Sequence, residues 1–426
     1  MESTELSKSL EIINNTLFEI DKRKNGFWIK MKKRIIFFDA NLSTLPAIKY
    51  AKSCGFHVVT CDNKAENPGH KEADESILIS TYDLDAIDAY IEKNPVDGVV
   101  YFASAHGSYA GSHVIEKFHL PGITESIKDT LSYKDNFRQY LKNNGFSSYP
   151  KFILLKGNTI PANIDSLTFP VIVKPTDSGG NKGITKVSDI AKLQEAVNLA
   201  FEESRSGNVV IEEYIDGTLQ INGDCIVENG VVKLAFLGRY LYPSCNKILP
   251  CATIFGNGVL SDDTLAQVKR EIQKLVSSTG IKSAALNLEF RVSSSGKIYF
   301  IEVNTRHSGN FIYQMMNMAY GISLEEISVK LALGEALGIT NESPNGYFAY
   351  TLFYSEKDGI LDSIEISEEL NRYIFKKIIF KKAGDTINKL TVLSDRIGVC
   401  LLKFPSFEKM TEITENFGNY YHINLK

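Results

Sequence analysis

Two apolar stretches that each contain one glutamate constrain the fold of this 426-residue sequence more than any other feature. The stretches 284–292 and 297–303 both read as strands, and the turn Ser293–Gly296 between them favours a hairpin. Glu289 lies in the first strand and Glu302 in the second. A carboxylate among apolar neighbours is costly to bury unless it is paired or binds a metal. The sequence therefore predicts a hairpin that brings these two carboxylates together.

Asn304 and Arg306, at the end of the second strand, extend this carboxylate pair. Two carboxylates and an amide offer the hard oxygen ligands that Mg²⁺ prefers, while water and phosphate oxygens fill its remaining positions. The Arg306 guanidinium can neutralise a transferring phosphoryl group or hold a carboxylate with two hydrogen bonds. The alternative is a half-exposed hairpin whose charged residues simply face solvent.

A strand that carries a lysine and runs into a glycine-rich loop is the second constellation. Val171-Ile-Val-Lys-Pro175 contains Lys174, and Asp177-Ser-Gly-Gly-Asn-Lys-Gly183 follows it. Glycine lets backbone N–H groups approach anionic oxygens, and lysine adds a positive charge, so we expect a phosphate site here. The loop is not a GxxxxGK[ST] sequence, and an ordinary hairpin turn is the alternative.

An apolar strand that ends in paired acids is the third constellation. The segment Val209–Gly217 contains Glu212 and Glu213, and its backbone edge and a carboxylate could bind an adenine and a ribose. A solvated strand end is an equal alternative for this segment in isolation. The order is more informative than any single motif, because the lysine and glycine loop, the acidic strand end and the carboxylate hairpin follow one another along the chain.

The N-terminal third alternates between strands and helices, which predicts a parallel sheet with crossover helices. Ligands of such sheets bind at the carboxyl ends of the strands, here near 39–44 and 62–67. No GxGxxG follows the first strand, so a dinucleotide site lacks support. The helical spacing of Leu6, Leu10, Ile13, Leu17 and Ile20 predicts an accessory amphipathic helix ahead of this sheet. The expected strands are 34–39, 57–61 and 96–102, and the expected helices are 45–54 and 84–92.

Length and composition limit the class of protein. The chain is too long for one ordinary core, so we expect two to four domains. Its 43% apolar and 23% charged residues are typical of a soluble protein, and a net charge of -4 without a polybasic tract argues against nucleic acid as a partner. The six cysteines form no metal or redox motif, and neither a signal peptide nor a membrane span is recognisable. We expect a cytoplasmic protein with no membrane partner.

With these motifs in this order, the chain from Arg34 onward resembles the ATP-grasp superfamily, and within it the carboxylate–amine ligases of the L-amino-acid-ligase type. Asn67-Pro-Gly-His-Lys-Glu-Ala-Asp74 matches a stretch of the domain that precedes the ATP-grasp fold in that family. Ser132-Tyr-Lys-Asp-Asn-Phe137, with Asn144-Gly145 and Tyr149-Pro150, is similar to the family's entry into the ATP-grasp fold.

The resemblance implies a multidomain protein of the α/β and α+β classes, in which an ATP-grasp fold follows a parallel-sheet domain. Its expected parts are an accessory N-terminal helix (1–30), a pre-ATP-grasp α/β domain (31–122), an ATP-grasp domain (123–340, with a lid at about 150–215) and a C-terminal subdomain that completes the ATP-grasp region (341–426).

The resemblance also implies a role for each matching residue. A flap would cover the β- and γ-phosphates of ATP, and a hinge would bind the adenine edge, largely through backbone groups. Catalysis would rest on Arg306 and Lys174, and Arg306 could also contact substrate. By their positions in the sequence, His307 and Arg239 are further candidates for a substrate contact, with a packing role for His307 and a surface salt bridge for Arg239 as the alternatives. The implied metal ligands, for Mg²⁺ or alternatively Mn²⁺, are Glu289, Glu302 and Asn304. The implied ATP contacts are Lys134, Lys174, Ser178, Gly179, Gly180, Lys182, Gly183, Glu212, Glu213, Tyr214, Ile215 and Gln220.

Two positions depart from the family's pattern. Gln220 stands where the family usually has a glutamate, although Asp224 keeps the end of that motif, so a charged contact to the ribose is not expected. Thr305 replaces a proline in the loop that contains Arg306, so this loop can be positioned differently.

The function implied is an ATP- and Mg²⁺-dependent ligase that converts a carboxylate to an acyl phosphate and couples it to an amine, often an amino acid. Two alternatives stay open: a carboxylase-type enzyme that activates bicarbonate, and a non-catalytic nucleotide-binding module. The partners implied are a small-molecule carboxylate and an amine, with a homodimer left open. The sequence does not identify the acid or the amine.

Overall fold

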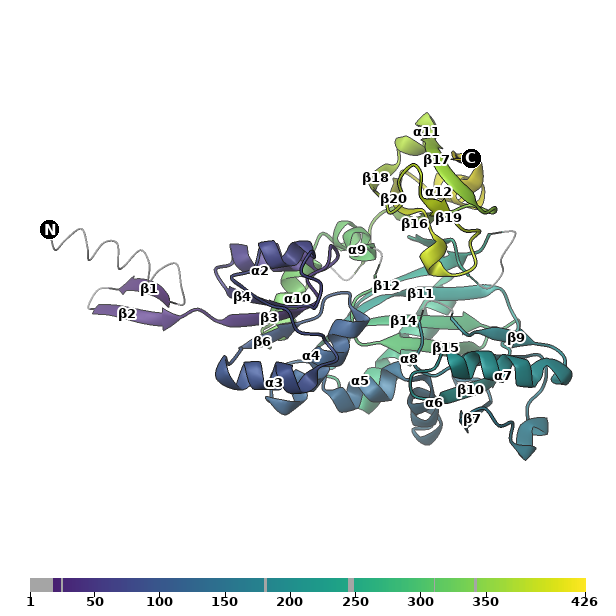
Figure 1. Ribbon diagram of the computed structural model, residues 1–426, viewed down its shortest axis with the longest axis horizontal. Coiled ribbons are helices and arrows are strands. Elements are labelled where there is room, and N and C mark those ends of the chain that lie inside the picture. The colour runs from purple at the N-terminus through teal and green to yellow at the C-terminus, as the bar shows by residue number, and fades with distance from the viewer. Residues whose placement is uncertain (1–17, 24–25, 180–181, 244–248, 310, 341–342) are drawn as a thin grey trace. The chain divides into compact units, whose positions relative to one another are not determined.

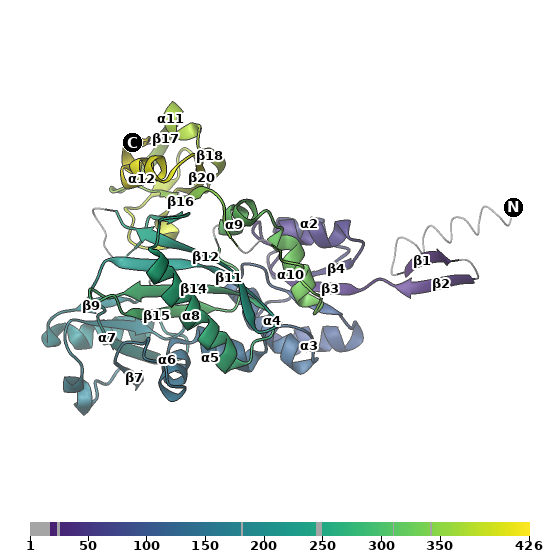
Figure 2. The ribbon, with the colours of Figure 1, turned by 180° about the vertical axis from the view of Figure 1, so that it is seen from behind.

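The structure is a computed structural model that describes residues 18–23, 26–179, 182–243, 249–309, 311–340 and 343–426 (Figures 1 and 2). It divides into two compact units. Unit 1 comprises residues 1–125 and 323–338, and unit 2 comprises residues 126–322 and 339–426. The division at 125/126 lies near the predicted boundary at 122/123. Residues 323–338, which we expected in the ATP-grasp domain, belong to unit 1 instead.

The start of the described chain is a β-hairpin. Strands β1 (Phe18–Arg23) and β2 (Gly26–Met31) pair antiparallel, with Phe18 opposite Met31. Most of the amphipathic helix predicted over Leu6–Ile20 lies outside the described residues. Its last position, Ile20, lies in β1, so the prediction of a helix is wrong at that end.

Unit 1 contains the predicted parallel sheet. Its described strands have the order β5-β4-β3-β6, and every neighbouring pair is parallel. The predicted strands and helices are confirmed with small shifts at their ends, and β5 and two further helices are added. The strands are β3 (Arg34–Phe38), β4 (His57–Cys61), β5 (Glu75–Ile77) and β6 (Gly98–Val100), and the helices are α2 (Leu45–Ser53), α3 (Leu84–Lys93), α4 (Ala105–Lys117) and α10 (Leu324–Ala332), with a 3-10 turn at Pro68–Lys71.

Helix α10 packs on α2 and β6 although it comes from a distant part of the chain. Gly98 makes this approach possible, because a Cβ at that position would lie 2.7 Å from the carbonyl oxygen of Ala332. The sheet core consists of buried aliphatic and aromatic side chains such as Ile36, Phe38 and Val59. This close packing explains why 323–338 folds with the N-terminal residues.

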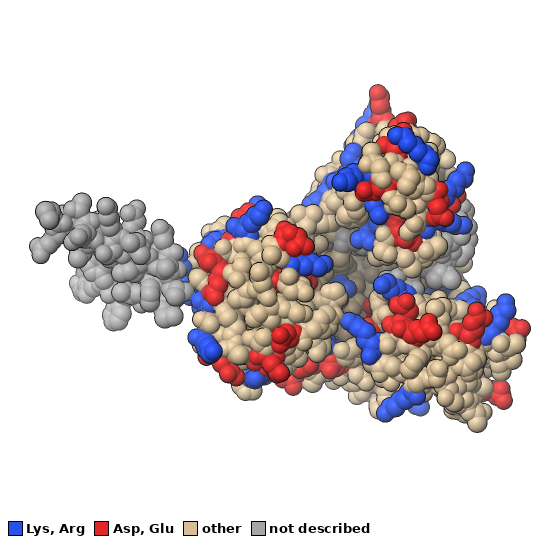
Figure 3. All heavy atoms as spheres, in the orientation of Figure 1, with Lys and Arg blue, Asp and Glu red and all other residues tan. Residues whose placement is uncertain are grey.

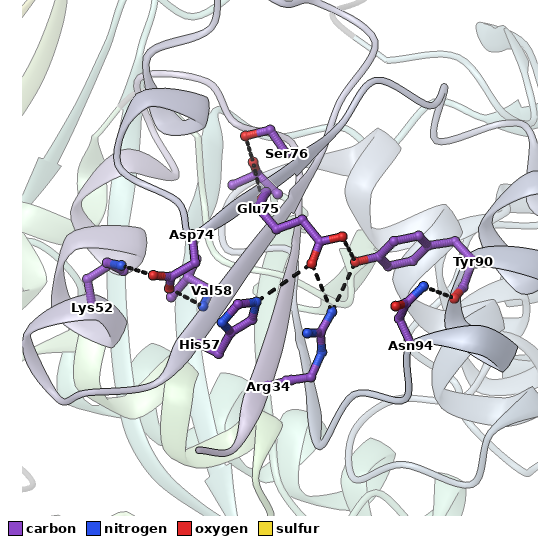
Figure 4. A network of polar contacts seen from close by, with 10 residues as sticks. Arg34, Lys52, His57, Val58, Asp74, Glu75, Ser76, Tyr90 and Asn94 are labelled. Carbon is purple, nitrogen blue, oxygen red and sulfur yellow. Dashed lines mark hydrogen bonds and ion pairs between the residues drawn. The ribbon is translucent and has the colours of Figure 1, made fainter. Parts of the chain in front are cut away.

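A polar network lies at the amino-terminal edge of this sheet (Figure 4). Glu75 accepts hydrogen bonds from Arg34 Nη2 at 3.0 Å and from the Tyr90 hydroxyl at 2.6 Å. His57 Nε2 lies 3.6 Å from the same carboxylate. Asp74 accepts from the Val58 amide at 2.8 Å and pairs with Lys52. Each carboxylate of this edge therefore has its own cation.

Unit 2 begins with a helical segment and a small antiparallel sheet. Within the described chain the sheet has the order β7-β10-β8-β9, and helix α7 packs on β8, β9 and β10. Its core is formed by residues such as Val171, Val173 and Ile211. The elements are α5 (Glu125–Ser132), α6 (Lys134–Asn143), β7 (Phe152–Lys156), β8 (Val171–Pro175), β9 (Thr185–Val187), α7 (Leu193–Glu202) and β10 (Asn208–Glu213), with 3-10 turns at Ala162–Ser166 and Ile190–Lys192.

The larger sheet of unit 2 carries the carboxylate hairpin. Its order in the described residues is β15-β14-β11-β12-β13-β16-β20-β18, and its neighbouring strands pair antiparallel. It combines strands of the predicted ATP-grasp domain with strands of the predicted C-terminal subdomain. The strands are β11 (Leu219–Glu228), β12 (Val231–Leu241), β13 (Ala252–Phe255), β14 (Ala284–Val292), β15 (Ile298–Asn304), β16 (Tyr347–Phe353), β18 (Ile374–Ile379) and β20 (Gly398–Phe404).

The remaining elements cover or extend this sheet. None of the helices in the described part of the chain has the length and apolar composition that a membrane span requires. Basic and acidic side chains are interspersed over the visible face of each unit (Figure 3). The elements are α8 (Asp262–Thr279), α9 (Ile312–Tyr320), α11 (Glu368–Asn371), α12 (Phe407–Glu415) and a small sheet of β19 (Thr386–Ile387), β17 (Gly359–Ile366) and β21 (Tyr421–Leu425), with 3-10 turns at Leu393–Asp395 and Phe417–Asn419.

The register of the large sheet sorts its side chains onto two faces. Residues directly opposite one another on paired strands point to the same face, and successive residues alternate. One row across the strands β15, β14 and β11 contains Glu302, Glu289 and Asn222. We call the face that carries these three residues the polar face. Helix α12 packs on β13, β16 and β20, where Phe407 contacts Tyr347 on the opposite face.

Candidate functional site

The two glutamates singled out in the sequence form a cross-strand pair. Strands β14 and β15 place Glu289 directly opposite Glu302, which confirms the predicted hairpin, and the register shifts between Glu289 and Phe290. Asn304 Nδ2 donates to Glu302 Oε1 at 2.8 Å, and the Tyr240 hydroxyl donates to Glu289 Oε1 at 2.7 Å. The structure thus brings together the three residues predicted as metal ligands.

The two carboxyl groups of this pair differ in their pKa. Burial and the charge of Glu302 raise the pKa of Glu289 to about 7. Burial also disfavours ionisation of Glu302, but the Lys134 charge, the Asn304 hydrogen bond and the Arg306 charge outweigh it and lower the pKa of that carboxyl. Near neutral pH, Glu302 is therefore ionised while Glu289 holds a proton part of the time. A cation bound between the two carboxylates would remove their repulsion.

The donor set fits Mg²⁺. Among the described residues no group of three or more Asp, Glu, His or Cys side chains could hold a metal ion. Mg²⁺ does not need such a group, because it is commonly held by one or two carboxylates together with water and substrate phosphates. Asn304 uses its Nδ2 in the bond to Glu302, so its Oδ1 is left as an acceptor. Glu289, Glu302 and the Asn304 oxygen are therefore suitable ligands.

Lys134 connects the carboxylate pair to the glycine-rich loop. It is the first residue of α6 and is 6% exposed. Its Nζ lies 3.5 Å from Glu302 Oε2 and donates to the backbone oxygen of Ser178 at 3.1 Å. One lysine thus places a positive charge beside both the predicted metal ligands and the predicted flap.

The flap residues themselves are mainly solvent-exposed. The Ser178 hydroxyl donates to the Glu203 backbone oxygen at 2.9 Å, which fixes the start of the loop. Gly179 and Lys182 are exposed, and Gly180 lies outside the described residues. Gly183 has φ 66°, and a Cβ there would lie 3.0 Å from Glu203 Cβ, so this position requires glycine.

A buried ion cluster lies behind the hinge. Glu212 accepts from Arg138 Nε at 2.6 Å and lies 2.6 Å from Lys174 Nζ, and each of the three residues is less than 5% exposed. Burial opposes ionisation of Glu212, but the charges of Arg138 and Lys174 lower its pKa to about 2. Burial lowers the pKa of Lys174 to about 8 in spite of Glu212. Both oxygens of Glu212 are used inside this cluster, so a nucleotide contact at this position would come from its backbone.

The rest of the hinge has a different role. Glu213 accepts from the Thr168 amide at 2.9 Å, and Ile215 is buried. The Tyr214 ring lies between two cations, with Lys186 Nζ 3.6 Å from its centroid and Arg291 Cζ 4.9 Å from it. Since Lys186 is on β9 and Arg291 on β14, Tyr214 links the small sheet to the large one.

Gln220 lies next to the carboxylate pair. Its Nε2 is 3.5 Å from Glu289 Oε2, and its Oε1 accepts from the Tyr242 hydroxyl at 2.6 Å. Arg291 Nη1 lies 3.5 Å from the same oxygen. The neutral amide therefore connects the carboxylate pair to the hinge side of the site, at the position where the resemblance implies a ribose contact.

The loop that contains Arg306 is held by a buried aspartate. Asp224 on β11 is fully buried and accepts from the Ser308 amide at 2.8 Å and from Asn287 Nδ2 at 3.1 Å. His307 Nδ1 lies 3.8 Å from the same carboxylate. Arg306 Nη1 donates to the His307 backbone oxygen at 2.7 Å. This arrangement positions the guanidinium near Glu302 without the proline of the family's loop, and His307 is buried rather than open to a substrate.

Arg239 is not part of the site. Alternation on β12 places it on the face opposite to Tyr240, where its Nη2 lies 3.7 Å from Glu415 Oε1 of α12. The prediction of a substrate contact is therefore wrong for Arg239, and the ion pair considered beside it is what the structure contains.

Four residues of the site were not proposed from the sequence. Tyr240 donates to Glu289 of the carboxylate pair, Tyr242 donates to Gln220, and Arg138 and Arg291 support the hinge. All four act through tertiary contacts that no local pattern in the sequence indicates.

A family model for the ATP-binding domain of the carbamoyl-phosphate synthase L chain matches residues 134–340. Two relatives illustrate the range of sequences. The carbamoyl phosphate synthase large chain of Methanocorpusculum labreanum is 23% identical over 310 residues, which are 69% of this chain and 28% of that protein. This chain therefore spans much less than the whole of that relative. The vancomycin C-type resistance protein VanC1 of Enterococcus gallinarum is 30% identical over 253 residues, which are 55% of this chain and 73% of that protein.

Two solved structures have the same fold. The L-amino acid ligase of Bacillus licheniformis has a TM-score of 0.78 at 20% identity and covers 93% of this chain and 100% of its own. The biotin carboxylase domain of the Hydrogenobacter thermophilus 2-oxoglutarate carboxylase, a dimer in complex with MgADP and bicarbonate, has a TM-score of 0.69 at 17% identity and covers 93% of this chain and 92% of its own.

Proposed function

Because the chain belongs to the ATP-grasp superfamily, we propose that it is an ADP-forming ligase that uses ATP and Mg²⁺ to join a carboxylic acid to an amine. One observation carries this proposal: the cross-strand pair of Glu289 and Glu302, with Asn304 on one side and Lys134 on the other. A nucleotide-binding module without chemistry would gain nothing from this repulsive pair, whereas a phosphoryl-transfer site needs it for its metal.

The residues of the site divide between positioning and charge neutralisation. Mg²⁺, when bound by Glu289, Glu302 and Asn304, would supply positive charge to the phosphate oxygens. Lys134 is placed beside that position and the flap, and Arg306 is placed beyond Glu302. Both cations would stabilise the charge that the transferring phosphoryl group develops.

The proposed reaction has two steps. An oxygen of the substrate carboxylate attacks the γ-phosphorus, the bond from that phosphorus to the bridging oxygen breaks, and ADP leaves. The amine nitrogen then attacks the carbonyl carbon of the acyl phosphate, inorganic phosphate leaves with the C–O bonding electrons, and the nitrogen loses a proton to give the amide. Water would compete with the amine, so closure of the flap 178–183 should protect the intermediate.

This proposal also assigns a role to several parts of unit 2. We assign the lid to residues 150–215, which contain the small sheet and the flap, and the nucleotide to the space between this lid and the polar face of the large sheet. Tyr214, held between Lys186 of the lid and Arg291 of the large sheet, is the hinge contact in this assignment. The adenine edge would meet the backbone of Glu213 to Ile215.

The test is phosphate release from ATP and Mg²⁺ across a matrix of amino acids and small carboxylates, with mass detection of the amide. We expect one or more acid–amine pairs to stimulate release and to yield a product lighter than the sum of both substrates by one water. Release that depends on bicarbonate instead would identify the carboxylase alternative. If neither bicarbonate nor any acid–amine pair stimulates release, the proposed ligase activity is excluded for those substrates and the binding module is favoured.

A further inference from the structure

The hydroxyl group of Tyr350 is buried and has no hydrogen-bond partner among the described residues. Tyr350 lies on β16 and is 6% exposed. Removing a phenol hydroxyl from water without a replacement partner costs about 1–3 kcal/mol, so buried tyrosines usually have one. Phenylalanine would fill the same volume without this cost. The hydroxyl is therefore better explained by a partner that comes and goes than by packing.

The register places this hydroxyl on the polar face. Tyr240 on β12 is opposite Thr253 on β13, and Thr253 is opposite Tyr350 on β16. These three residues form one row across the sheet, and Tyr240 is the residue that donates to Glu289. Since neighbouring strands lie about 4.8 Å apart, the Cα atoms of Tyr240 and Tyr350 are separated by roughly 10 Å. A molecule of amino-acid or dipeptide size can span that distance.

Aromatic side chains flank this row on the same face. Phe255 on β13 and Phe348 on β16 are opposite one another, and Phe255 stacks on Phe236 with the ring centroids 4.3 Å apart. The ring of Tyr320 on α9 also contacts the Phe236 ring, with the two centroids 6.2 Å apart. The row that contains Tyr350 therefore lies beside a row of aromatic side chains on the same face.

The charge around Tyr350 favours an anionic acceptor. The row continues to Leu401 on β20 and Lys376 on β18, and Lys376 Nζ lies 4.7 Å from the centroid of the Phe311 ring at the start of α9. Burial raises the pKa of the Tyr350 phenol well above its usual value, against the charge of Arg396. The phenol therefore stays protonated and is able to donate a hydrogen bond, and Lys376 on β18 continues its row across the sheet.

We propose that Tyr350 is a specificity-determining residue that donates a hydrogen bond to a carboxylate which does not react, carried by the amine substrate. This inference rests on the proposed ligase function and narrows its amine to an amino acid or short peptide with a free carboxylate. The reacting carboxylate would lie by Glu289 and Glu302, and the second carboxylate would lie toward Tyr350 and Lys376. Amines without a carboxylate would leave the hydroxyl unpaired.

The experiment compares free L-amino acids with their carboxamides as amine donors in the phosphate-release assay, for the wild type and for Tyr350→Phe. We expect the wild type to prefer the free acid, and Tyr350→Phe to raise KM for that acid about 10- to 100-fold while kcat changes less than about threefold. KM for the amide should change less than about threefold. Tyr347→Phe is the matched control, because it removes a hydroxyl from the same strand on the opposite face.

A second readout separates this proposal from the proposed function. Thermal unfolding with Mg²⁺ and a non-hydrolysable ATP analogue reports binding of each amino acid without turnover. The acid that stabilises the wild type should stabilise Tyr350→Phe much less, and Tyr347→Phe as much as the wild type. If no acid–amine pair releases phosphate but this binding difference is found, the ligase reaction fails and the carboxylate contact stands. The inference is overturned if Tyr350→Phe leaves KM and binding of the free acid unchanged. A lower melting temperature of Tyr350→Phe without ligand would also overturn it, because the hydroxyl would then have an internal partner.

Discussion

The polar edge of the unit 1 sheet and the carboxylate pair of unit 2 are built from the same residue types and behave in opposite ways. In unit 1 the side chain of Glu75 is 35% exposed, and in unit 2 both Glu289 and Glu302 are likewise only partly buried, so exposure does not separate the two clusters. Burial would raise the pKa of Glu75, but the hydrogen bonds from Tyr90 and Arg34 lower it below its usual value. Glu289, by contrast, has its pKa raised to about 7.

The difference lies in how the carboxylates are paired with cations. Asp74 and Glu75 each have a cation of their own, Lys52 and Arg34 (Figure 4). Glu289 and Glu302 face each other and share Lys134, whose Nζ lies 3.5 Å from Glu302 Oε2. A polar cluster in which every carboxylate has a cation stabilises a fold. A cluster in which a carboxylate lacks its own cation indicates a place where a ligand supplies that partner.

The largest expected effect comes from breaking the carboxylate pair. Glu302→Gln should reduce ATP-dependent phosphate release roughly 10²- to 10³-fold, because it removes a charged ligand at the point where phosphoryl charge develops. The measurement is phosphate release at saturating Mg²⁺, with Glu195→Gln in the exposed face of α7 as a control. Activity within threefold of the wild type would show that this pair does not hold the metal.

The next largest effect should come from the paired cluster of unit 1. Arg34→Met removes two hydrogen bonds and leaves Glu75 with His57 and Tyr90. We expect the free energy of unfolding to fall by about 1–2 kcal/mol, since the cluster is partly exposed. Denaturant unfolding measures this loss. Mg²⁺ affinity of the folded protein should not change, and a change would argue against treating the cluster as purely structural.

A smaller effect should appear when pH is varied without metal. Because the pKa of Glu289 is raised in the folded state, the native protein binds more protons than the unfolded chain between about pH 4.5 and 7. The contribution of this group to stability is therefore present at the acidic end and is lost as pH rises through that window. Unfolding of wild type and Glu289→Gln, measured across this range, should differ in slope. Parallel curves would mean that burial and the charge of Glu302 do not raise the pKa of Glu289.

The smallest effect is expected on the opposite face of β12. Arg239→Met should change phosphate release by less than about twofold and stability by less than about 1 kcal/mol, because the ion pair with Glu415 is exposed. Steady-state kinetics of this variant beside Tyr240→Phe check the assignment of the two faces. A larger loss for Arg239→Met than for Tyr240→Phe would contradict the register of β12 with its neighbouring strands.

The sequence predicted the strands of the site well because their periodicity is strong and their turns are marked. The strand predicted over 284–292 has the same bounds as β14, and the turn Ser293–Gly296 joins it to β15. The roles of side chains were harder to predict. Glu212 was expected at the nucleotide, but its two cations come from β8 and α6, which the sequence does not place beside β10.

Two missed helices have physical explanations. Helix α9 begins after Phe311 in a left-handed conformation and has no side-chain cap, so no start signal precedes it. Helix α4 contains Gly107 and Gly111, which normally disfavour a helix. Both glycines are needed there, because a Cβ would lie 2.7 Å from the Phe38 oxygen or 2.3 Å from the Tyr101 ring.

The alternation along β12 and β16 also matters for anyone who wishes to redesign this protein. On β12, Tyr240 points to the carboxylate pair, and its neighbour Arg239 points to α12. On β16, Tyr350 and Tyr347 are divided in the same way. A library at Tyr240 would vary contacts on the polar face, whereas Phe236 and Phe348 of the same face are buried and belong to the core, so parity alone does not separate the site from the scaffold. Inserting or deleting a single residue in either strand would exchange the two roles at once.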